Sequence, residues 1–469
     1  MPKRKLHSVP GMHPSNPYYS NPPDFVALAE QYPSFKPYVT AKTTGSKVRG
    51  AINFRDPEAL RELTYCLLRK DFSIELDIPI GSLCPAVPNR VNYICWIEDL
   101  MHNNSKSTIN GIDIGTGASC IYPLLARARN KNWKMVATDI DDRSISFANK
   151  NVLDNNFHQS ISVLKNTSSN IFPSVLFEAK EQKYDFCMCN PPFYEDEQDI
   201  QEGFDGKEEE PSAVCHGTSN EMMTAGGEVQ FVKQMIDESR HWQTRIRWYT
   251  SMLGKKNSLD DIIAYLKDHK ILNYTLTTLR QGRTSRWAVA WSFGDEHASW
   301  ASMQHISNKM TKLTAPATVL SFEVSDTNAE EAVSSAKSLL EQLAIDCQPA
   351  EAEFTNEPEG SRALFHGKAR TNTWSRAARR AMARGTKHGD GGQSDTVASE
   401  NMDQSTTLTI MGFDLRIFSS KEQELEESTS STPLTVELTW TVGQDRDLFE
   451  SFFLHFRSRL LPAHDRHHH

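Results

Sequence analysis

Residues 109–117, INGIDIGTG, join a short apolar run to a glycine-rich turn, and this stretch decides the fold. A polar stretch with helical spacing begins near Cys120 and leads to another apolar run. Repeated strand, turn and helix is typical of a parallel sheet with crossover helices. The sequence therefore predicts an α/β domain with a Rossmann-like, seven-stranded sheet, its strands at residues 109–114, 135–139, 161–164, 184–189, 247–252, 274–279 and 287–293.

The flanking sequence predicts further parts. We expect residues 1–50 to form an irregular, basic and aromatic RNA-binding arm, and residues 51–295 to form the α/β domain. That domain opens with a helix at 57–70, capped by Asp56, and a second helix follows Pro88. Residues 296–316 are expected to be a linker. A small α+β accessory domain at 317–462 follows, with a strand from Thr318, a helix at 329–343, strands at 408–418 and 434–442, a helix at 447–460 and an inserted loop at 349–402.

Composition narrows the class of protein. The 469 residues carry a net charge of −9, but residues 195–210 hold nine acids and one lysine, so the rest is close to neutral. Charge therefore does not exclude an RNA ligand, because local patches steer RNA. No apolar run approaches the roughly 20 residues of a membrane span. Eight cysteines without a C-x-x-C pair indicate reduced thiols and no zinc site, and we expect Cys187 and Cys189 to be core residues.

The turn after the first strand has features of a nucleotide-like cofactor site. Gly115 and Gly117 permit close approach of backbone amides to a ligand, and they follow Asp113. Asp139 ends the second strand, where a carboxylate can accept hydrogen bonds from ribose hydroxyls. A tight turn without a ligand remains an alternative. A dinucleotide is disfavoured because Cys120 stands where a third glycine is expected. S-adenosylmethionine needs ribose contacts but has no pyrophosphate, so the presence of Asp139 favours this cofactor.

Asn190, Pro191, Pro192 and Phe193 follow the apolar run at 184–189. An exocyclic adenine amine is a poor nucleophile because its lone pair is delocalised into the ring. The Asn190 side-chain oxygen and the Pro191 carbonyl can accept both amino hydrogens, while the prolines stiffen the loop and Phe193 stacks on a flipped base. The tetrapeptide also suits DNA adenine and a glutamine amide, although glutamine methyltransferases usually carry Tyr at the fourth position. A simple turn is the remaining alternative.

Several segments together resemble the methyltransferase-like protein 16 family over about residues 24–294. They are NFRDPEA at 53–59, VPNRVNYI at 87–94, DIGTGASCIYPL at 113–124, NPPF at 190–193, GGE at 226–228, WYTSMLGKK at 248–256 and QGRTSRW at 281–287. The resemblance implies a class I methyltransferase domain that methylates adenosine N6 in U6 small nuclear RNA. Bacterial relatives methylate an adenine of large-subunit ribosomal RNA.

The resemblance also implies residue roles. Arg90 would reach the cofactor carboxylate, a task suited to its bidentate fork. Asp113, Gly115, Gly117 and Asp139 would lie at the cofactor, with Thr167 near its adenine ring and Asn190 between cofactor and target base. The sequence departs from the family in the strongly acidic loop after the catalytic motif.

Basic residues predict RNA contacts. Around the catalytic domain the candidates are Lys47, Arg49, Lys255, Lys256, Arg283 and Arg286. Arg376, Arg379 and Arg380 belong to an arginine-rich stretch that suits binding to the RNA backbone and, nearly as well, a nuclear-localisation signal. The family has vertebrate members with a C-terminal RNA-binding domain of kinase-associated-domain type, and the order of elements after residue 317 is compatible with one.

These observations lead to one hypothesis with two rivals. We expect a monomeric, S-adenosylmethionine-dependent RNA adenosine N6-methyltransferase without metal or membrane association. Its substrate would be a structured RNA, U6 small nuclear RNA, and its location nuclear, with a cytoplasmic pool also compatible. The rivals are a ribosomal RNA adenine methyltransferase and a non-catalytic RNA-binding protein with a decayed methyltransferase fold. A decayed fold is disfavoured because the candidate site residues are intact, namely Asp113, Gly115, Asp139, Asn190 and Phe193.

Overall fold

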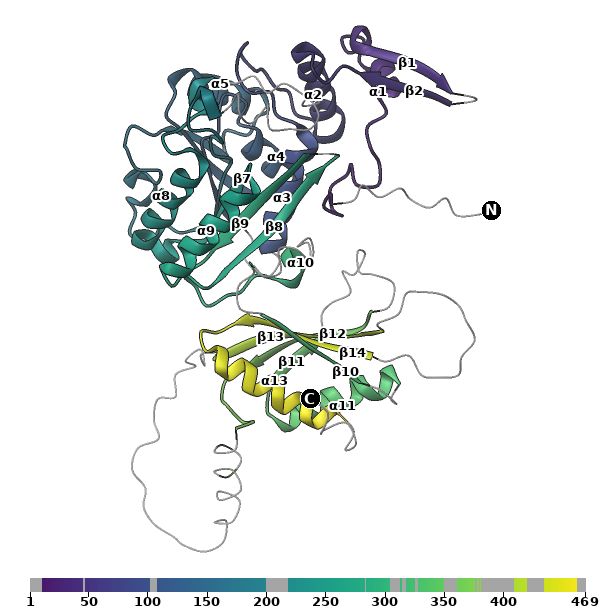
Figure 1. The fold of residues 1–469 in the computed structure, drawn as a ribbon, viewed down its shortest axis with the longest axis vertical. Helices are drawn as coiled ribbons and strands as arrows, with labels where there is room; N and C mark the ends of the chain where they lie inside the picture. Colours follow the sequence, from purple (N-terminus) through teal and green to yellow (C-terminus); the bar gives the residue numbers. More distant parts are fainter. Residues whose placement is uncertain are drawn as a thin grey trace, which may run out of the picture. The chain divides into compact units, whose positions relative to one another are not determined.

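The chain forms two compact units in a computed structural model (Figure 1). One unit comprises Met1–Gly294 with Ala301–Ala315, and the other comprises Asp295–Trp300 with Pro316–His469. The predicted linker at 296–316 is thus divided between them. The structure describes residues 11–44, 47–101, 108–199, 218–282, 284–303, 313, 318–324, 328–349, 361–375, 378, 380, 409–419 and 434–461.

The N-terminal region is more regular than expected. Helix α1 (Phe25–Gln31) is capped by Asp24, and strands β1 (Val39–Thr44) and β2 (Lys47–Ile52) pair as an antiparallel hairpin. The prediction of an irregular arm up to residue 50 was therefore wrong in this part, because Thr- and Lys-rich strands lack the apolar alternation that marks a half-buried strand.

Two helices follow and lead to the sheet. Helix α2 (Pro57–Phe72) is capped by Asp56, whose carboxylate accepts hydrogen bonds from the backbone amides of Glu58 and Ala59, so the predicted cap is confirmed. Helix α3 (Val87–Met101) is buried along most of its length. The buried Asn16 side chain donates to Pro88 O at 2.9 Å and to Asn92 Oδ1 at 2.7 Å, which fastens the start of the chain to α3.

The central sheet has seven strands in the order β5-β4-β3-β6-β7-β9-β8, which confirms the predicted architecture. Strands β3 to β7 run parallel, and β9 is antiparallel to both β7 and β8. Strands β4 and β6 flank β3, and all three end at the same edge of the sheet. The glycine-rich turn after β3 and residues 190–193 after β6 therefore lie at this edge. The strands are β3 (Ile109–Ile114), β4 (Trp133–Asp139), β5 (Ile161–Lys165), β6 (Tyr184–Cys189), β7 (Ile246–Leu253), β8 (Tyr274–Gln281) and β9 (Thr284–Trp291).

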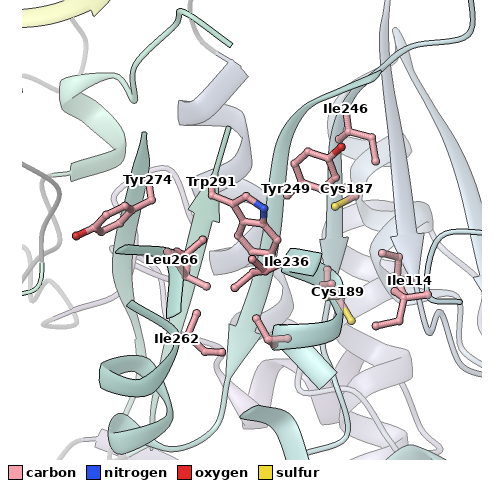
Figure 2. Packing of buried hydrophobic residues seen from close by; sticks show 14 of the residues in the cluster. Ile114, Cys187, Cys189, Ile236, Ile246, Tyr249, Ile262, Leu266, Tyr274 and Trp291 are labelled. Atoms are coloured by element: carbon pink, nitrogen blue, oxygen red, sulfur yellow. The ribbon is translucent and has the colours of Figure 1, made fainter. Parts of the chain in front are cut away.

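Helices cover both faces of this sheet (Figure 1). One core cluster joins the strands to α8 and α9, and Figure 2 shows Ile236, Ile262 and Leu266 of these helices set against the sheet. Cys187 and Cys189 lie in this cluster as free buried thiols, as expected. The helices of the sheet region are α4 (Ile121–Arg129), α5 (Asp142–Asp154), α7 (Ser219–Met222), α8 (Gly227–Trp242), α9 (Lys256–Asp268) and α10 (Trp300–Met303).

The second unit is a five-stranded antiparallel sheet, ordered β10-β14-β13-β12-β11, with helices α11 and α13 packed in its core. Residues 349–402 were predicted to be a loop, but β12 (Ser361–Ala369) lies within them and pairs with β13. This strand was not predicted because it lies in a polar stretch and its partner strand β13 is distant in the sequence. The other elements are β10 (Val319–Val324), α11 (Ala329–Gln342), β11 (Asp346–Pro349), β13 (Met411–Ser419), β14 (Leu434–Val442) and α13 (Arg446–Leu460).

Candidate active site

The loop after β3 folds across the end of β4. Gly115 and Gly117 have φ values of +70° and +62°, in the left-handed region that favours glycine. The amides of Gly115 and Thr116 both donate to Thr138 O at 2.9 Å. A Cβ atom at Gly115 would meet nothing within 4 Å, so this turn borders open space at the carboxyl edge of the sheet.

Asp139 ends β4 beside this loop. Its carboxylate accepts hydrogen bonds from Gly117 N at 2.8 Å and from Asp141 N at 3.0 Å. Burial raises the pKa of Asp139, and these backbone hydrogen bonds oppose the rise. Each carboxylate oxygen has a second lone pair, so Asp139 can still accept hydrogen bonds from a ligand.

Asp113 lies beneath the glycine loop with only 1% of its surface exposed. Both carboxylate oxygens and the Thr116 hydroxyl are buried without a hydrogen-bond partner among the described residues. Burial raises the pKa of Asp113 to about 7; the negative charge of Asp139 adds to this rise, and the positive charge of Arg90 opposes it. Buried polar groups normally have partners, so this cluster indicates where a ligand would supply them.

Arg90 reaches the same edge from α3. Its Nη1 donates to the Tyr122 hydroxyl at 3.1 Å, and its guanidinium carbon lies 5.3 Å from the centroid of that ring. Its Nε is buried with no hydrogen-bond partner in the described part of the chain. One side of the guanidinium is thus held by protein, and a donor remains for a ligand.

Asn190 follows β6, the strand next to β3. The Tyr93 hydroxyl lies 2.7 Å from Thr250 Oγ1 and 3.5 Å from both Cys189 N and Cys189 O, which fixes the end of the strand. The Asn190 Oδ1 atom is buried and, within the described residues, has no hydrogen-bond partner. A buried amide oxygen without a partner is an unsatisfied acceptor, and a hydrogen-bond donor from a ligand would stabilise it.

Phe193 lies between two predicted RNA-binding regions. The Arg286 guanidinium lies over its ring, 5.2 Å from the centroid. A Cβ atom at Gly254 would meet Phe193 Cδ1 at 3.0 Å, so the ring packs closely against the turn that precedes Lys255. The catalytic loop, Arg286 and the start of α9 therefore come together around one aromatic ring.

Lys255 and Lys256 are exposed at the start of α9. Cations are unfavourable at a helix N-terminus because the helix dipole is positive there, which favours a role other than stability. Lys255 Nζ lies 2.6 Å from Asp199 Oδ1. Burial alone would raise the pKa of Asp199, but the hydrogen bond from Lys255 lowers it. The described start of the acidic stretch thus neutralises one predicted RNA-binding lysine.

The remaining predicted site residues are placed less fully. Thr167 is exposed and follows Asn166. The backbone amide of Asn166 donates to the Asp139 carbonyl oxygen at 2.7 Å. Arg380 is exposed on a short helical segment of the second unit. Lys47 and Arg49 belong to β2, but their side chains lie outside the described residues, as do Arg283, Arg376, Arg379 and most of the acidic stretch.

Sequence patterns did not indicate two residues that the structure adds to the site. Tyr122 holds Arg90, and Glu221 reaches the glycine loop from the segment after the acidic stretch. Both contacts join residues at least 32 positions apart, so no local pattern could reveal them. No group of metal-ligating side chains occurs among the described residues, and none of the helices they form has the length and apolarity to cross a membrane.

Comparison with known proteins identifies the family. Residues 6–295 match a family model described as RNA methyltransferase. The RNA N(6)-adenosine-methyltransferase mettl16 of Danio rerio is 36% identical over 459 residues, which cover 93% of this chain and 94% of that protein. The chain belongs to the METTL16 family of RNA methyltransferases.

Other METTL16 proteins support this assignment. The METTL16 protein of Mus musculus is 42% identical over 333 residues, and this chain spans 59% of its length. The catalytic domain of human METTL16, solved with the MAT2A 3'UTR hairpin 1, is 44% identical with a TM-score of 0.56, covering 61% of this chain and 96% of that one. The N-terminal domain of human METTL16 with SAH gives a TM-score of 0.51 at 44% identity, covering 61% of this chain and 99% of that one.

Proposed function

We propose that this chain transfers a methyl group from S-adenosylmethionine to the N6 atom of an adenosine in RNA, with U6 small nuclear RNA as its substrate. The observation that carries this proposal is the buried Asn190 Oδ1 atom, which has no partner among the described residues and follows the strand next to the glycine loop. An acceptor in this position matches the amino group of adenine.

The residues at the carboxyl edge fit the cofactor. Arg90 offers a buried donor for its carboxylate, and Asp139 offers lone pairs for its ribose. Gly115 leaves the space beside the loop open. When bound, S-adenosylmethionine supplies an activated methyl group on a sulfonium centre. The protein's task is to place the adenine amine in line with that methyl group and to exclude competing water.

Asn190 and the following prolines perform that task. Asn190 Oδ1 and the Pro191 carbonyl accept the two amino hydrogens, which favours a pyramidal nitrogen with its lone pair directed toward the methyl group. Phe193 supports the base, and Arg286 over its ring brings a cation close to the RNA backbone. A dedicated base is not required, because the nitrogen becomes acidic as it is methylated and its proton can leave after methyl transfer.

The RNA target is inferred from relatives. A Drosophila melanogaster protein named U6 small nuclear RNA (adenine-(43)-N(6))-methyltransferase is 38% identical over 294 residues, covering 61% of this chain and 95% of that protein. A catalytic domain 44% identical to this chain was solved with an RNA hairpin. These matches support a structured RNA substrate. A nuclear substrate in turn implies a nuclear location, and we propose that the enzyme acts as a monomer.

The test compares wild type with Asn190→Ala. Labelled S-adenosylmethionine and a U6 RNA fragment are supplied, and methyl transfer and cofactor affinity are measured separately. Loss of transfer with nearly unchanged cofactor affinity is expected, because the Asn190 acceptor matters mainly in the transition state. A substrate with the target adenosine replaced by guanosine is the control for position. Equal turnover by wild type and variant would contradict the assignment.

A further inference from the structure

The segment of residues 218–224, called the strap here, connects three parts of the site. Tyr194 N donates to Met222 O at 3.1 Å, and Thr224 N donates to Tyr194 O at 2.9 Å. These two hydrogen bonds join the strap directly to the residue after Phe193. The strap therefore fixes the exit of the catalytic loop.

Glu221 ties the same strap to the cofactor side. Its Oε2 accepts hydrogen bonds from Leu83 N at 3.1 Å, Thr218 N at 2.8 Å and Thr218 Oγ1 at 3.0 Å. Leu83 lies four residues before α3, the helix that carries Arg90. The carboxylate thus joins the strap to the segment that leads to the predicted cofactor-binding arginine.

The second oxygen of Glu221 faces the glycine loop. Its Oε1 lies 3.5 Å from the position of a Cβ atom on Gly117, whose amide donates to Asp139. Hydrogen bonds to a charged carboxylate are stronger than those between neutral groups. One side chain therefore binds the strap to the segment before α3 and lies against the cofactor loop, while the backbone of the same strap holds the catalytic loop.

We propose that Glu221 is a positioning residue that makes cofactor binding and target-adenosine binding cooperative. The inference rests on the proposed function. Ordering of the cofactor loop orders the strap through Glu221, and the strap in turn orders the exit of Asn190–Phe193. Each ligand then binds more tightly once the other is bound, and this coupling is reciprocal. Neither Arg90 nor Asn190 alone provides such a connection.

The experiment measures the dissociation constant of S-adenosylmethionine by calorimetry, with and without a saturating U6 RNA fragment, on the full chain. In wild type we expect RNA to tighten cofactor binding by at least about fivefold, the lower end of typical coupling. Glu221→Ala should bring that ratio close to one. Glu221→Gln retains one acceptor for Leu83 N and should keep part of it.

Glu197→Gln is the matched control, because this substitution removes the same charge as Glu221→Gln. Glu197 is exposed in the described start of the acidic stretch. Its ratio should equal that of wild type. If Glu221→Ala does not fold, Glu221→Gln supplies the measurement. A wild-type ratio in both Glu221 variants, or no coupling in a wild-type enzyme that methylates RNA, overturns the inference. Absence of methylation in wild type would instead contradict the proposed function.

Discussion

The Arg90 guanidinium donates to the Tyr122 hydroxyl at 3.1 Å and lies 5.3 Å from the centroid of the same ring. Tyr122 thereby sets the direction of the arginine fork before any cofactor binds. We expect Tyr122→Phe to weaken S-adenosylmethionine binding by about 1 kcal/mol, the usual contribution of one hydrogen bond. The ring and its cation–π contact would remain. Calorimetric titration measures this loss.

Arg90→Ala is the reference for that measurement. Removal of the whole guanidinium should cost about 1–3 kcal/mol of cofactor binding, because a charge-assisted pair is lost. The effect of Tyr122→Phe should vanish in the Arg90→Ala background, since we expect the Tyr122 hydroxyl to act on the cofactor through Arg90. Additive losses would show that Tyr122 acts elsewhere.

Gly254 controls the position of Phe193. A Cβ atom there would meet Phe193 Cδ1 and Cγ at 3.0 Å and Glu228 Oε2 at 3.2 Å. We therefore expect Gly254→Ala to displace the ring by a few tenths of an ångström and to lower kcat about tenfold, because small misplacements near the reacting atoms are costly. Cofactor affinity should not change. Single-turnover kinetics measures the rate of methyl transfer.

Phe193→Leu provides the control for this prediction. Gly254→Ala should have little further effect once the aromatic ring is absent, because the crowded contact no longer exists. An equal loss in both backgrounds would mean that the methyl group disturbs Glu228 or the start of α9 instead.

The sequence predicted the parts of the fold that depend on local apolar runs. The seven strands of the central sheet were expected at nearly their observed positions, although β4 begins at Trp133, two residues earlier than expected. Strand β12 was missed because SRALFHGKA mixes polar residues with a glycine and pairs with β13, more than 40 positions away. Pairing between distant strands has no local sequence signature.

In the candidate active site, too, features that lie within one short segment were predictable from the sequence, whereas contacts between distant residues were not. The glycine loop and the residues 190–193 each lie within one short segment, so their chemistry could be inferred from neighbouring residues. The roles of Tyr122 and Glu221 depend on contacts such as the one from Glu221 to Leu83, which are 138 positions apart. The pairing of Lys255 with Asp199 likewise became visible only in the structure.

Asp113 predicts a pH dependence of stability. Burial raises its pKa to about 7, far above the 3.8 of an exposed aspartate. The folded state therefore binds more protons than the unfolded state between about pH 4 and pH 7, and this contribution to stability falls as pH rises through that window. Asp113→Asn, which mimics the neutral carboxyl, should flatten the curve. Thermal unfolding of the cofactor-free protein between pH 4 and pH 8 measures the difference. A parallel shift of both curves would assign the dependence to other groups.

The catalytic unit extends beyond residue 300. The sequence predicted that the α/β domain ends at residue 295, but the structure assigns Ala301–Ala315 to the first unit. The buried Trp96 indole donates to Ser302 O at 3.0 Å, and the Tyr274 hydroxyl donates to Leu313 O at 3.1 Å. Truncation at residue 300 removes both acceptors, and we expect it to destabilise the unit by about 1–3 kcal/mol for each buried donor left unpaired.

A chain ending after residue 315 should retain its stability and its turnover at saturating RNA, because the residues of the candidate active site all precede residue 295. It should nevertheless bind RNA more weakly and with a shallower dependence on salt, since the arginine-rich stretch of the second unit would no longer contact phosphates. Charge reversal at Arg376, Arg379 and Arg380 in the full chain should reproduce part of that loss. RNA affinity measured at several salt concentrations distinguishes the variants, with thermal unfolding of the two truncated chains as the control. Equal affinities and salt slopes in the full, truncated and charge-reversed proteins would show that the second unit serves a role other than RNA binding.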